Sequence, residues 1–136
     1  GSDKAHGSGC VIGGATVLPD GIWFGSADSV AAGQITFDLA CFWTGAEAEA
    51  RAAADGEEAF DFYIRNVNPL TFAVPIAGSA RAWWIEASGS DFFPVEIPVT
   101  SWPRPGSWLD CPSEYCAVWL YVNGGQATGI VEQYLP

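Results

Sequence analysis

Apolar and polar residues alternate at period two in two segments that flank an alanine-rich run. In the first segment the odd positions of residues 35–41 are apolar, and in the second the even positions of residues 60–64 are apolar. Successive side chains of a strand point to opposite faces of a sheet, so this alternation predicts two strands with one buried face each.

The run between these segments predicts a single helix. Residues 46–54 are mostly alanine, which is the best helix former. Thr44 and Glu47 have the spacing of a capping box, and Gly56 suits the left-handed residue that ends a helix. Such a short helix does not persist alone in water, so it must pack on the strands. The alanines expected to share the packing face are Ala46, Ala50, Ala53 and Ala54.

Turn signals divide the remaining chain into further strands. Asp20-Gly21 precedes a strand that runs toward Val30, and Asn123-Gly124-Gly125 predicts the turn of a hairpin near the C-terminus. We therefore predict a mostly β fold: an antiparallel small barrel or sandwich of about seven or eight strands with one Ala-rich helix packed on it. The other expected strands are residues 70–76, 81–87, 92–99, 117–122 and 126–135, with prolines that favour edge positions in the first and third.

Composition narrows the class of protein. A chain of 136 residues fits a single domain, expected here over residues 10–136. Gly1-Ser2 look like the remnant of a tag, and residues 1–9 are expected to be a flexible N-terminus. The net charge of −11 argues against binding nucleic acid or anionic membranes. No apolar run approaches the roughly 18 residues of a membrane-spanning helix.

Four cysteines in such a small chain indicate disulfides and therefore an exported protein. Their spacing is not that of a zinc site. We expect Cys10 to pair with Cys41, because this bridge would tie the N-terminal segment to a central strand. We expect Cys111 to pair with Cys116 across a short loop. The alternatives are a bridge from Cys10 or Cys41 to the 111–116 loop, and four reduced thiols packed as small apolar residues.

Three motifs resemble a known family. FDLACFWTG at residues 37–45, DFYIRNVNP at 61–69 and the C-terminal VWLYVNGGQATGIVEQYLP are similar to a family of small exported actinobacterial proteins of unknown function. The likeness covers most of residues 20–136. It implies a secreted or cell-envelope location and no particular activity. The family carries an Arg after the Asn-Pro turn, where this chain has Leu70-Thr71-Phe72.

Few residues could perform catalysis. The lone histidine, His6, lies in the N-terminal tail, which argues against Ser-His, Cys-His and His-metal sites. A pair of carboxylates could act as acid and base in glycoside hydrolysis. The alternative is a structural polar network with the asparagines of the turn near residue 68. These asparagines, with Asp61 and Glu58, could also bind calcium, but the spacing of a calcium-binding loop is missing. The residues of the expected network are Asp38, Asp61, Asn66, Asn68 and Glu132.

Aromatic residues are the last candidate for function. Trp102, Trp108 and Tyr115 lie in a Pro-rich stretch and could contact a sugar ring or a partner protein, or fold back onto the core. We expect an exported non-enzymatic module that binds a ligand or partner, a protein or a glycan, at the cell envelope or outside the cell. The alternative is a carboxylate-dependent hydrolase acting on envelope glycans. We expect a monomer with no cofactor and no bound metal.

Overall fold

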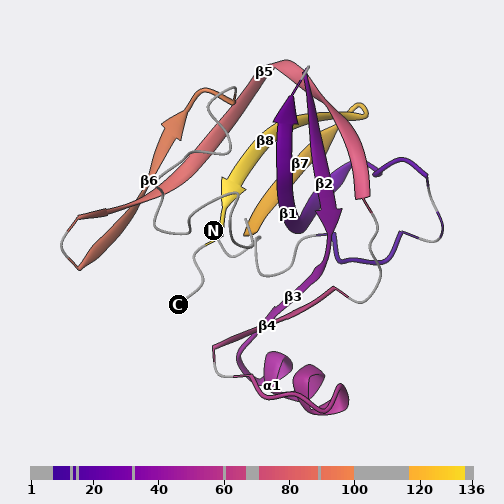
Figure 1. The fold of residues 1–136 in the computed structure, drawn as a ribbon, viewed down its shortest axis with the longest axis vertical. Helices are drawn as coiled ribbons and strands as arrows, with labels where there is room; N and C mark the ends of the chain where they lie inside the picture. Colours follow the sequence, from indigo (N-terminus) through magenta and orange to yellow (C-terminus); the bar gives the residue numbers. More distant parts are fainter. Residues whose placement is uncertain are drawn as a thin grey trace.

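The computed structural model describes residues 8–12, 14, 16–31, 33–59, 61–66, 71–88, 90–99 and 117–133. Strands dominate this part of the chain and one helix accompanies them, which confirms the predicted fold class. Figure 1 shows their arrangement. The elements are β1 (Gly21–Ala31), β2 (Gln34–Leu39), β3 (Cys41–Thr44), α1 (Gly45–Ala54), β4 (Phe62–Arg65), β5 (Thr71–Ser88), β6 (Asp91–Ile97), β7 (Ala117–Asn123) and β8 (Gln126–Glu132).

Five of the strands close into a barrel. They lie in the order β2-β1-β7-β8-β5, and β5 returns to pair with β2. All neighbours are antiparallel except β5 and β8, which are parallel. If the barrel strands β1, β2, β5, β7 and β8 are numbered one to five, their order around the barrel is 1-2-3-5-4. The parallel pair, β5 and β8, are then the third and fifth strands. This is the strand order of the OB-fold, a five-stranded Greek-key barrel, although connectivity alone carries no function.

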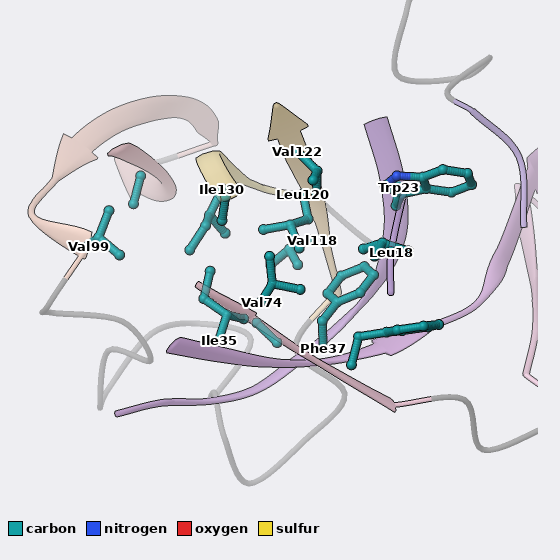
Figure 2. Packing of buried hydrophobic residues seen from close by; sticks show 14 of the residues in the cluster. Leu18, Trp23, Ile35, Phe37, Val74, Val99, Val118, Leu120, Val122 and Ile130 are labelled. Atoms are coloured by element: carbon teal, nitrogen blue, oxygen red, sulfur yellow. The ribbon is translucent and has the colours of Figure 1, made fainter. Parts of the chain in front are cut away.

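The barrel interior is the main hydrophobic core. Ile35, Phe37 and Leu39 point inward with at most 4% exposure, as the alternation predicted. Figure 2 shows the labelled core side chains clustered across the barrel interior, between Val99 on the left and Trp23 on the right.

The N-terminal segment covers the Trp23 end of the barrel. Leu18 is buried in the core, and the Trp23 indole donates a hydrogen bond to the carbonyl of Pro19 at 2.7 Å. The Ser8 backbone N–H bonds the carbonyl of Ile22 at 2.7 Å. The Cys10–Cys41 disulfide is present, with the two Cα atoms 5.2 Å apart, which confirms this predicted pair.

A β ribbon carries the helix outside the barrel. β3 pairs with β4, and α1 packs against these two strands, below the barrel in Figure 1. Aromatic side chains join the ribbon to the outer face of the barrel: the Phe42 ring lies 4.6 Å from that of Phe24 and 5.9 Å from that of Trp119. This second apolar cluster fixes the ribbon to the barrel wall.

The helix begins and ends where the sequence predicted, but two details differ. Thr44 is the N-cap residue, yet its side chain makes no capping hydrogen bond. At the other end Gly56 has a φ of 74°, and the backbone N–H groups of Gly56 and Glu57 bond the carbonyls of Ala53 and Ala52, a Schellman motif. The predicted packing face is wrong, because the buried alanines are Ala48 and Ala52, whereas Ala46, Ala50, Ala53 and Ala54 are exposed.

The fifth strand is longer than predicted. Residues 70–76 and 81–87 were expected as separate strands, but β5 runs through both and pairs in turn with β2, β8 and β6. Pro75 lies in the last pair of the β2–β5 ladder, opposite Gln34. Within the described residues no helix is long and apolar enough to cross a membrane.

Candidate functional site

A cavity of ≈ 570 Å³ lies at the end of the barrel opposite Leu18 and Trp23. It forms where β1 ends and β5 bends. These parts of the two strands lie in the upper part of Figure 1. Its size is typical of a site for a small molecule. The residues that line it are Val30, Ala31, Gly33, Ile76, Ala77, Gly78, Ala80, Pro98 and Val99.

An irregularity in β5 opens this cavity. Ile76 pairs with Ala127 and Arg81 with Gly129, so the four residues 77–80 of β5 face the single residue 128 of β8. A bulge of this kind bends a strand and interrupts its ladder. The bulged residues, Ala-Gly-Ser-Ala, are small, so the bend leaves space that side chains do not fill.

The cavity has an apolar floor and a solvent-exposed mouth. Val99 belongs to the barrel core, and Val30, Ile76 and Ala80 pack against that core. Ala31, Gly33, Gly78 and Pro98 are exposed. A ligand that enters at the mouth can therefore reach the core without opening the barrel.

The chemistry of the cavity wall is simple. Among the described residues, the nine that line the cavity are glycine, proline or aliphatic, so none of their side chains can ionise or form a hydrogen bond, and none is aromatic. This described part of the wall offers apolar contact from its side chains and hydrogen bonds from its main chain.

Asp38 and Asn66 come together on the outer face of the barrel. Burial raises the pKa of the Asp38 carboxyl, the Asn66 side chain lowers it by hydrogen bonding, and the charge of Asp28 raises it. Ser26, which lies opposite Asp38 in the β1–β2 ladder, donates a hydrogen bond to the Asp28 carboxylate at 2.8 Å. Asp38 Oδ1 is buried and has no hydrogen-bond partner among the described residues.

Glu132 lies on the other side of the barrel wall. Across the sheet, Glu132 pairs with Val118, Val118 with Gly25, and Gly25 with Leu39. Leu39 and Val118 belong to the barrel core, and Glu132 itself is 2% exposed. One carboxylate oxygen accepts the Ile85 backbone N–H at 2.6 Å, just past the end of the parallel β5–β8 ladder. Asp38 is the neighbour of Leu39 in β2, so its side chain points to the opposite face of the barrel wall. The wall therefore separates the two carboxylates.

The other predicted site residues do not join these groups. Asp61 is exposed in the segment before β4. Among the described residues no three His, Cys, Asp or Glu side chains form a group that could hold a metal. The predicted residues outside the described part of the chain are Asn68, Trp102, Trp108, Cys111, Tyr115 and Cys116.

The cavity was not predicted from the sequence. Its lining comes from three short segments, VAAG at 30–33, IAGSA at 76–80 and Pro98-Val99, which carry no motif. The available signal was the run of small residues inside an otherwise apolar strand, since glycine within a strand often marks a bulge.

Comparisons with family models, with curated proteins and with solved structures found no match. The resemblance to exported actinobacterial proteins therefore stays a prediction.

Proposed function

We propose that this protein is an exported, non-enzymatic module that binds a ligand in the cavity at the barrel end. The observation that carries the proposal is an open, apolar-walled space of ≈ 570 Å³ at one end of a closed barrel. Sites built on strands are held more firmly than sites on loops, so the cavity is suited to binding.

One feature supports export: the Cys10–Cys41 disulfide is of the kind that persists in oxidising compartments. The strongly acidic composition bears on the partner instead, because it argues against nucleic acid.

The positions of the carboxylates favour binding over hydrolysis. A glycoside hydrolase needs two carboxyl groups that flank one bond, roughly 5–9.5 Å apart. Asp38 and Glu132 lie on opposite faces of the barrel wall, and no carboxylate is among the described residues that line the cavity. The contribution of Trp102, Trp108 and Tyr115 to binding remains a prediction from the sequence.

A blocking variant tests the proposal. Ala80 lies in the cavity wall and packs on the core, so Ala80→Phe should fill the space. Ala73→Phe is the matched control, because Ala73 is an exposed residue of β5 outside the lining. In a thermal-shift screen with uncharged fragments, a ligand at 100 times its Kd should stabilise the protein by about 2.7 kcal/mol.

We expect the screen to find fragments that stabilise the natural protein and Ala73→Phe but do not stabilise Ala80→Phe. Gly78→Phe provides a second block, because a Cβ at Gly78 would meet no atom within 4 Å. Hits that persist in both blocked variants, or a screen without hits, would overturn the proposal.

A further inference from the structure

We infer that the cavity takes an aliphatic chain with an uncharged polar head, inserted chain first. This inference rests on the proposed function and names the class of ligand. It follows from the chemistry of the wall, from the position of the floor and from the charge of the molecule.

The described part of the wall disfavours two common ligand classes. An ionised group placed in the cavity would lose its hydration, and none of the described lining residues offers a charged side chain in exchange, which is costly. Sugar rings and bases are commonly held by stacking on aromatic side chains, and none of the described lining residues is aromatic.

The floor favours a flexible apolar chain. Ile76, Ala80 and Val30 pack against the core, so a ligand chain that reaches the floor contacts side chains of the core itself. Each methylene buried in this way should raise the affinity about fourfold, which corresponds to about 0.8 kcal/mol. The gain should stop once the chain fills the cavity.

The mouth can hold an uncharged head group. Residues 77–80 have no Cα partner in the β2, β6 or β8 ladders, so main-chain groups of this bulge are candidates for hydrogen bonds to a ligand. The Ile76 N–H is already used, because it bonds the Gly33 carbonyl at 2.9 Å. A hydroxyl, ester or amide can bond main-chain groups without carrying charge.

The net charge of the protein also favours an uncharged head group over an anionic one. At −11, the molecule repels an anionic head group at low salt. A carboxylate should therefore bind more weakly than the alcohol of the same chain length, even though their chains bury the same surface.

A homologous series tests the inference. Linear alcohols from butanol to dodecanol and the matching alkanoates are titrated by calorimetry into the full chain with its Cys10–Cys41 disulfide intact. We expect the affinity for alcohols to rise about fourfold per methylene up to a break, with each alkanoate weaker than its alcohol. Ala73→Phe should show the same rise of affinity with chain length. In Ala80→Phe and Gly78→Phe the rise should stop at a shorter chain or disappear.

The outcomes separate the two proposals. If ring-containing fragments bind in a way that Ala80→Phe abolishes while alcohols do not bind, the ligand class is wrong and the binding function stands. If alcohols bind equally well to both blocked variants, they bind elsewhere and the inference fails. If no fragment of any class responds to the blocks, both proposals fail.

Discussion

At the scale of single residues, the described carboxyl groups whose pKa is shifted fall into two groups with opposite effects on stability. Burial raises the pKa of Asp38 in the folded protein. Hydrogen bonds from the backbone of Gly124 and Gly125 lower that of Asp20, and Arg65 and Tyr63 lower that of Asp55. A raised pKa means that ionisation costs stability, and a lowered pKa means that it adds stability.

Asp38→Asn should therefore stabilise the protein at pH 7. The folded-state pKa of Asp38 lies above the ordinary 3.8, so the ionised carboxylate disfavours folding above that pKa and has no such effect below 3.8. The advantage of the variant should shrink as the pH falls toward 3.8. Urea unfolding of both proteins between pH 7 and pH 3 measures it.

Asp55→Asn is the matched control with the opposite sign. Asp55 accepts two hydrogen bonds from Arg65, at 2.7 and 3.0 Å, and one from Tyr63 at 2.8 Å. This variant should be less stable than the natural protein at pH 7, with a deficit that disappears as the pH falls through the lowered pKa of Asp55. Equal pH profiles for the two variants would contradict the assignment of both groups.

At the scale of elements, α1 is held more firmly at its C-terminus than at its N-terminus. Thr44→Ala removes no capping hydrogen bond, so it should cost less than about 0.5 kcal/mol. Gly56→Ala places a side chain at a φ of 74° and should cost about 1 kcal/mol. Free energies of unfolding from urea titrations compare the two, and a larger loss for Thr44→Ala would show that the cap bond forms in solution.

The sequence predicted the position of this helix better than its contacts. A capping box requires the side chain of the N-cap residue to turn toward the first helical N–H groups. Thr44 is also the last residue of β3 and pairs with Phe62, so the strand fixes its backbone at φ −130° and ψ 163°. The buried face of the helix could not be predicted from the sequence, because an alanine run presents similar side chains in several directions.

At the scale of the whole molecule, local patterns predicted the strands and long-range pairing decided the rest. Period-two alternation placed Ile35, Phe37 and Leu39 in the core, and the Gly124-Gly125 turn joins the predicted hairpin. Neither pattern shows that β5 closes on β2 while running parallel to β8. The cavity depends on that closure and on a register shift, so it could not be predicted from residues that are unremarkable one by one.

The Cys10–Cys41 disulfide is a covalent cross-link, besides the main chain, between the N-terminal segment and β3. It joins residues 31 positions apart, and the chain-entropy model assigns about 3–4 kcal/mol to a loop of this size. The double variant Cys10→Ser/Cys41→Ser should lose about that much unfolding free energy in urea. Cys111→Ser/Cys116→Ser keeps the first bridge and should lose less, and a reversed order would contradict this view of the fold.

The parallel pairing of β5 with β8 also has a consequence for how the molecule is made. β8 is the last barrel strand in chain order, and it lies between β7 and β5. A nascent chain that has already emerged through β7 still lacks the strand that completes the barrel, and its strands retain open edges. Closure, and with it the cavity at the barrel end, must therefore wait until residues 126–132 have left the ribosome.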